Sequence, residues 1–210
     1  MTRLAWGTPG ERFYETGVDR GVLYVDNTGY AWNGLISVQE KSSGGDPQPF
    51  FLDGYKYTQI SATEDFEATI EAVSSPREFS PCDGSTELYA GLTVTQQKRK
   101  QFGLSYRTLL GNDSSGLSLG YKIHLVYNAL SGPSERNNQT NQNDSEVMTL
   151  SWSITTNPPP ATGFRPTSHF IVDTRRASSG DVTALEDILY GTGATTARFP
   201  SVAEVVALFA

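Results

Sequence analysis

A strict alternation between large apolar residues and hydroxyl-bearing residues runs from Met148 to Thr155. The apolar set, followed by the hydroxyl set, is Met148, Leu150, Trp152, Ile154 and Thr149, Ser151, Ser153, Thr155. A period of two places each set on its own face of a β-strand. Because one face is polar, this strand does not fit a parallel sheet covered by helices on both sides. It predicts a sandwich or barrel with one solvated face.

A second segment, Phe66–Val73, alternates in the same way and also permits a helix. Phe66, Ile70 and Val73 fit a helical stripe, and Ser61 with Glu64 could form a capping box. A helix would place the like charges of Glu67 and Glu71 one turn apart, which is slightly unfavourable. We therefore favour a strand.

The rest of the chain predicts an all-β fold with minor α content, a β-sandwich or barrel. At 210 residues one domain is expected, with an N-terminal arm (1–11), a β-domain (12–180) and a helical tail (181–210). A helical turn is predicted at Pro76–Phe79, and the tail holds helices at Thr183–Tyr190 and Ser201–Phe209. The remaining expected strands are Arg12–Thr16, Val22–Asp26, Leu35–Gln39, Phe50–Tyr57, Phe102–Leu110, Leu119–Tyr127, Val147–Thr156 and Ser168–Thr174.

Two polar connections are long enough to predict a functional or disordered loop. Ser42–Pro49 is rich in Gly, Ser and Pro and is expected to form a flexible hairpin tip. Ser131–Glu146 is almost wholly polar. Loops of such length are uncommon in compact domains without a function.

Charge and composition exclude several classes of protein. The net charge is −7, so binding of nucleic acid by charge is not expected, although the chain could surround DNA without adhering to it. The single cysteine, Cys82, excludes an internal disulfide and is expected to be a buried thiol in a reducing compartment. Neither a signal peptide nor an apolar run that could span a membrane is found, so a soluble chain with no membrane partner is expected.

The search for catalytic chemistry finds no convincing site. Gly116–Gly120 matches a nucleophile elbow around Ser118, but a strand pattern follows where that motif requires a helix. Glu67 and Glu71 would lie roughly 13 Å apart on a strand, too far for a catalytic carboxylate pair. His124 and His169 have no recognisable metal-ligand spacing and are interpreted as ordinary strand residues. No catalytic residue, metal or cofactor is therefore predicted.

Nine blocks, in order along nearly the whole chain, carry a family resemblance. They are Glu11–Tyr24, Ala31–Leu35, Gly44–Tyr57, Phe66–Ala72, Glu78–Gly84, Phe102–Asp113, Gly120–Tyr127, Met148–Ser153 and Pro166–His169. With these blocks the chain resembles the major tail tube proteins of bacteriophages with long non-contractile tails, in particular those of actinobacteriophages. These blocks consist of residues that form the fold, and they contain no catalytic signature.

The resemblance implies a structural virion protein whose fold is a β-sandwich or split barrel of the tail-tube type, with one short flanking helix and a helical C-terminal tail. Such proteins form six-membered rings that stack into a hollow tube around a tape-measure protein, and the genome later passes through the tube. The resemblance also implies tail terminator and tail-tip proteins as partners, location in the virion tail after synthesis in the bacterial host cytoplasm, and DNA that transits without specific binding. Sheets of six subunits would join into one inner barrel, while loops and arms would bridge the rings.

Candidate residues for this assembly follow from the polar strand faces and the projecting segments. Those expected to face the lumen are Glu67, Thr69, Glu71, Thr149, Ser151, Ser153 and Thr155. Those expected to contact the next ring are Trp6, Ser43, Gly44, Gly45, Asp46, Pro47, Phe50, Phe51, Val205 and Phe209. Three rival functions stay open: a tail terminator or head–tail connector ring, a β-sandwich carbohydrate-binding module, and a hydrolase that uses Ser118.

Overall fold

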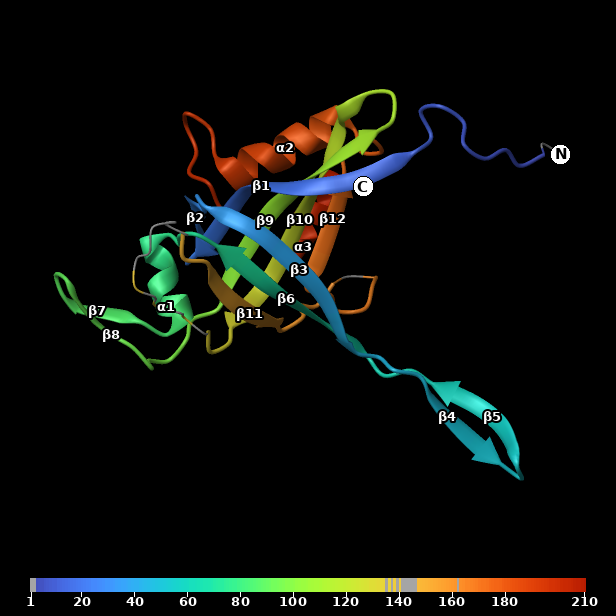
Figure 1. Cartoon of the computed structure of the whole chain (residues 1–210), viewed down its shortest axis with the longest axis horizontal. Coiled ribbons are helices and arrows are strands. Elements are labelled where there is room, and N and C mark those ends of the chain that lie inside the picture. The colour runs from blue at the N-terminus through green and yellow to red at the C-terminus, as the bar shows by residue number, and fades with distance from the viewer. Residues whose placement is uncertain (1–2, 135, 137, 139, 141–146, 162) are drawn as a thin grey trace.

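The chain folds around one antiparallel sheet of eight strands (Figure 1). The computed structural model describes residues 3–134, 136, 138, 140, 147–161 and 163–210. Seven strands follow one another in the order β2-β1-β9-β10-β11-β6-β3, and β12 pairs with β10 beside this path. The strands are β1 (Phe13–Val25), β2 (Thr28–Ala31), β3 (Leu35–Gly44), β6 (Glu64–Ala72), β9 (Phe102–Asn112), β10 (Gly116–Ser131), β11 (Leu150–Thr156) and β12 (His169–Asp173).

The sheet curls into a split barrel because its long strand β10 is shared. Lys122–Val126 of β10 pairs with β12, whereas Ala129–Ser131 pairs with β11. On the other side the start of β3 returns to β1, where the Leu35 side chain lies over Gly21. A Cβ on Gly21 would lie 2.7 Å from the Leu35 side chain, so a larger residue there would force that side chain to move. The all-β prediction with few helices is confirmed.

Aromatic rings fill the barrel. Trp152 is fully buried between Phe79 and Trp32, with ring centroids 5.1 and 5.8 Å away. Its indole N–H donates to Asp83 at 3.1 Å. Cys82 is also fully buried here, as expected, and burial raises the pKa of its thiol to about 12.

Two C-terminal helices cover the outer face of the barrel and enclose a second core. They are α2 (Ser179–Tyr190) and α3 (Val202–Leu208). Leu185, Leu189 and Val205 pack there against residues of β1, β10 and β12. The Tyr24 hydroxyl donates to the Leu189 carbonyl at 2.8 Å and fixes the end of α2 against the sheet. The capping box of Ser201 and Glu204 is confirmed, whereas α2 begins one turn before the predicted helix.

Smaller elements project from the barrel. The 3₁₀ turn η1 (Arg77–Phe79) leads into α1 (Ser80–Asp83), close to the predicted helical turn. Two hairpins stand outside the main sheet: β4 (Gln48–Leu52) with β5 (Tyr55–Ile60), and β7 (Thr86–Tyr89) with β8 (Leu92–Val94). No helix among the described residues has the length and apolar character needed to cross a bilayer.

Several predicted elements differ from the structure. The helical alternative for Phe66–Val73 is wrong, because these residues form β6. The predicted strand Phe50–Tyr57 is also wrong, because Asp53 and Gly54 turn the chain with φ of 48° and 79°. Two left-handed residues in succession are the signature of a type I′ hairpin turn. The tip of this hairpin is therefore Asp53–Gly54, and not Ser42–Pro49.

Candidate functional site: a polar sheet face, projecting arms and a histidine cluster

The polar faces of β3, β6 and β11 form one continuous surface. The register places Glu67 opposite Thr155, Thr69 opposite Ser153, and Glu71 opposite Ser151. On the other side of β6 the same residues lie opposite Lys41, Gln39 and Ser37. Because directly opposed residues point to the same side of a sheet, these nine residues share one face. The alternate residues Ala68, Ile70, Trp152 and Ile154 are buried in the barrel.

Six of the seven lumen candidates lie on this face, and Thr149 does not. Thr149 and Met148 precede β11, and both are exposed. The first residue of β11, Leu150, pairs with Ala72, the last residue of β6, so no partner strand continues the ladder toward Met148. The predicted strand therefore begins too early, and burial of Met148 was a wrong expectation.

The polar face carries net negative charge. Asp65, which lies opposite Ser43, extends the row of Glu67 and Glu71 along β6. Lys41 is the one basic residue on the face, so three carboxylates stand against one ammonium group, a net of two negative charges. Ser37 donates to the Glu71 carboxylate at 2.9 Å, which holds that side chain along the sheet.

The β4–β5 hairpin forms an apolar arm far from the barrel. It continues outward from the ends of β3 and β6 (Figure 1). Every residue from Asp46 to Asp65 is exposed in this chain. Six of its large apolar side chains are between 45% and 79% exposed: Phe50, Phe51, Leu52, Tyr55, Tyr57 and Ile60. Single exposed apolar residues are ordinary, but a contiguous set of this size marks an interaction surface.

The other ring-stacking candidates occupy different positions. Ser43 and Gly44 end β3, and Gly45, Asp46 and Pro47 link it to β4 at the root of the arm. Trp6, 84% exposed, lies in an N-terminal segment that extends away from the barrel (Figure 1). That segment is fixed at its base, where the Gly10 N–H donates to Asp113 at 2.9 Å and Asn112 donates to the Gly10 carbonyl.

The two C-terminal candidates differ in their exposure. Val205 is buried in the second core of its own chain, and Phe209 packs against the same cluster while partly buried. Val205 is therefore not available to a neighbouring ring, whereas the half-buried Phe209 stays a candidate. The apolar stripe predicted for α3 is present, and its residues Val202 and Val205 pack against the core of their own chain.

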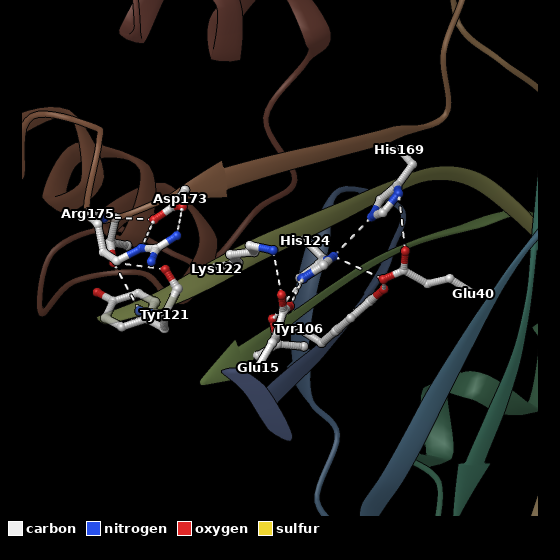
Figure 2. A network of polar contacts seen from close by, with 11 residues as sticks. Glu15, Glu40, Tyr106, Tyr121, Lys122, His124, His169, Asp173 and Arg175 are labelled. Carbon is white, nitrogen blue, oxygen red and sulfur yellow. Dashed lines mark hydrogen bonds and ion pairs between the residues drawn. The ribbon is translucent and has the colours of Figure 1, made fainter. Parts of the chain in front are cut away.

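The two histidines meet at one end of the barrel with a glutamate from β3 (Figure 2). His124 Nδ1 lies 3.1 Å from His169 Nε2 and 3.2 Å from Glu40 Oε1. His169 Nδ1 lies 3.8 Å from Glu40 Oε2. The Tyr106 hydroxyl donates to Glu40 Oε1 at 2.6 Å, and its ring stacks on the His124 imidazole.

The surroundings of this cluster set its ionisation states. The contacts of Glu40 with His124 and with the Tyr106 hydroxyl, together with the neighbouring His169, lower the pKa of Glu40 to about 2, although burial acts in the opposite direction. Burial lowers the pKa of His169 to about 4, partly offset by Glu40. Near neutral pH the site therefore holds an ionised Glu40 carboxylate beside a neutral His169 imidazole.

Sequence reasoning missed this cluster. Glu40, His124 and His169 stand on three different strands, and their separations along the chain fit no metal-binding motif. The available signal was weak: both histidines fell within predicted strands, but only the strand register places them together. Ser118, by contrast, is exposed on β10 with no helix after it, so the structure gives the nucleophile-elbow motif no support.

Comparisons with known proteins give loose structural likenesses. No family model and no curated protein matches the chain. A chain of an extracellular contractile injection system, the PVC sheath–tube complex, aligns over 80% of this chain and 93% of its own at 14% identity and a TM-score of 0.36. A chain of the anti-feeding prophage baseplate aligns over 82% of this chain and 97% of its own, at 9% identity and a TM-score of 0.38. Hcp1 from Flavobacterium johnsoniae aligns over 74% of this chain and 95% of its own, at 13% identity and a TM-score of 0.34. Likenesses at these identities and TM-scores carry no functional assignment.

Proposed function

We propose that this chain is a structural subunit that assembles with copies of itself into rings, and that the rings stack into a tail tube. The observation that carries the proposal is the β4–β5 arm. Its six large apolar side chains are exposed in the single subunit and lie on an element that contributes nothing to either core. An exposed apolar surface of this kind marks a site of contact with a partner.

Open strand edges supply a means of ring closure. Among the described residues, β3 ends the strand path and leaves its outer edge unpaired, while β2 covers only Val22–Val25 of β1. The residues Phe13–Asp19 of β1 are thus open on the side away from β9. Two different edges on one subunit permit head-to-tail pairing, which closes into a ring when the rotation permits. The number six is taken from the family resemblance.

The polar face of β3, β6 and β11 is proposed to line the bore. It offers hydroxyl groups and a net of two negative charges per subunit, which a ring would repeat around its axis. At physiological salt the Debye length is about 8 Å, so DNA in a narrow bore would be repelled and not adsorbed. This property suits the later passage of a genome through a tube that has first formed around a tape-measure protein.

Electron microscopy of concentrated, purified protein tests the proposal. We expect hollow tubes of constant diameter built from stacked rings. Rings that never stack would instead favour a terminator or connector role, and particles that remain single subunits at all concentrations would contradict assembly altogether. A variant in which Gln48–Ile60 is replaced by a short Gly-Ser linker should stay folded and form no tubes. Tubes formed by that variant would show that the arm is not the bridge.

A further inference from the structure

Three side chains with metal-binding groups converge at the mouth of the barrel. Glu40 comes from β3, His124 from β10 and His169 from β12, and their ligand atoms all lie within 4.8 Å of one another (Figure 2). His124 is almost fully buried, with 4% of its side chain exposed, whereas Glu40 is 37% exposed. The cluster is therefore anchored in the barrel and open to solvent on the side of Glu40.

The hydrogen bonds around His124 direct one nitrogen into the cluster. The Glu15 carboxylate accepts hydrogen bonds from the Lys122 ammonium group and from the Thr108 hydroxyl. The Thr108 hydroxyl must then donate to Glu15 and accept from His124 Nε2, 3.0 Å away. With its proton on Nε2, a neutral His124 presents the Nδ1 lone pair to His169 and Glu40. Metal-binding histidines are typically oriented in this way by a partner on the second nitrogen.

The spacing and the chemistry of the three groups suit a transition metal ion. For Zn–N bonds of about 2.0–2.1 Å, two ligands of a tetrahedral ion lie roughly 3.3 Å apart. The observed separations of 3.1 Å between the two imidazole nitrogens and 3.2 Å from His124 Nδ1 to Glu40 Oε1 are close to this value. Two imidazoles and one carboxylate favour Zn²⁺ and similar ions over Mg²⁺ or Ca²⁺, which prefer oxygen ligands.

We propose that Glu40, His124 and His169 bind one divalent transition metal ion of the Zn²⁺ class, with a water in the fourth position. The ion would connect β3 with β10 and β12, which do not pair with β3 in the sheet. Since β3 leads directly into the β4–β5 arm, the ion would fasten the root of that arm to the barrel. The binding itself does not depend on whether the chain polymerises.

Titration of tag-free, chelator-treated full-length protein with Co²⁺ tests the binding. The chain has only two histidines, so any coordination of Co²⁺ by imidazole must come from His124 and His169. We expect visible absorption of a tetrahedral Co²⁺ complex at one equivalent per chain, lost when Zn²⁺ is added. Equilibrium dialysis with Zn²⁺ should show binding weakened by at least about tenfold in Glu40→Gln, His124→Gln and His169→Gln. Glu67→Gln, a carboxylate change on the opposite face of the β3–β6 pair, should bind like the wild type.

Two results would overturn the proposal. The first is an absence of saturable metal binding. In that case the His169 ring would donate a hydrogen bond to His124 and complete the polar network without an ion. The other is equal binding by Glu40→Gln and Glu67→Gln. If His124→Gln fails to fold, the more exposed Glu40 and His169 variants still decide the result. The fastening role is tested by limited proteolysis at Gly45–Pro47: Zn²⁺ should slow cleavage in the wild type and not in Glu40→Gln, and cleavage unaffected by Zn²⁺ in both would refute that role.

Discussion

The indole N–H of Trp152 donates to the carboxylate of Asp83 at 3.1 Å and thereby joins β11 to α1. The carboxylate also accepts from Arg136 at 2.8 Å, and only 9% of the Asp83 side chain is exposed. A buried N–H that loses a charged acceptor keeps its full desolvation penalty. This contact therefore holds the short helix that closes one end of the barrel.

Replacement of Asp83 should destabilise the subunit. We expect Asp83→Ala to lower the free energy of unfolding by about 1–3 kcal/mol, because the Trp152 N–H would stay buried without an acceptor. Urea unfolding, at protein concentrations too low for assembly, measures this loss in the free energy of unfolding. The Trp152→Phe variant and the double variant complete a cycle that isolates the coupling between the two side chains. Asp187→Ala, an exposed change on α2, is the control, and additive losses in the cycle would contradict a direct contact.

Reversal of charge on the polar face should make assembled tubes retain DNA. In the double variant Glu67→Lys, Glu71→Lys, Asp65 is the one acid left beside three lysines, so the face becomes positive. Retention of short duplex DNA by pelleted tubes should rise at low salt and fall steeply as salt increases, since phosphate contacts release counterions. The double variant Glu78→Lys, Asp187→Lys makes the same charge change at exposed sites elsewhere. Equal retention by both variants would place the effect outside the bore.

Truncation of aromatic residues in the arm should weaken polymerisation without weakening the fold. Phe51 and Tyr57 are 60% and 72% exposed, so Phe51→Ala and Tyr57→Ala should leave the melting temperature of the subunit unchanged. If a neighbouring subunit covers these side chains, each truncation loses about 1.5–3 kcal/mol of burial free energy. The critical concentration for polymerisation should then rise about 10- to 100-fold. Sedimentation across a concentration series measures this. Tyr89→Ala, on the β7–β8 hairpin, is the control, and an equal effect there would indicate unspecific surface adhesion.

Acid should selectively weaken the attachment of α3. Hydrogen bonds from Arg198 and from the Ser201 backbone lower the pKa of Glu204 to about 2. A depressed pKa in the folded state contributes stability that is present above the unfolded value, about 4.3, and is lost as the pH falls toward 2. Because the group is largely exposed, this contribution should stay below about 1 kcal/mol.

The matched variant is Glu204→Gln, which keeps the capping geometry and removes the charge. Thermal unfolding should show the wild type slightly more stable than the variant at pH 6, and the difference should vanish near pH 2. A difference that is constant from pH 6 to pH 2 would mean that the charge of Glu204 contributes nothing.

The period-two patterns were the most predictive part of the sequence. They identified β6 and most of β11, because burial of alternate residues is encoded locally. Met148 was misplaced since a strand ends where its partner ends, and the end of β6 at Ala72 is not visible in the β11 pattern. The β4–β5 hairpin was missed because its two strands read as one apolar run, although Asp53-Gly54 carries a turn signal.

The candidate sites depended on information that local patterns lack. Periodicity showed that Val205 must be buried, but it did not show whether its own chain or a neighbour would cover it. The histidine cluster depends on strand register, since β12 brings His169 beside His124 only through the pairing of Val126 with His169. Such contacts between distant residues are fixed by the whole fold and not by any short segment.

The buried position of Cys82 has a practical consequence for studies of assembly. Its thiol is enclosed among aromatic rings, and burial suppresses the thiolate that alkylating reagents and oxidants attack. No other cysteine occurs in the chain. A cysteine introduced at the end of the β4–β5 arm would therefore be the sole reactive one, so a fluorophore or crosslinker could report on that position without any background substitution.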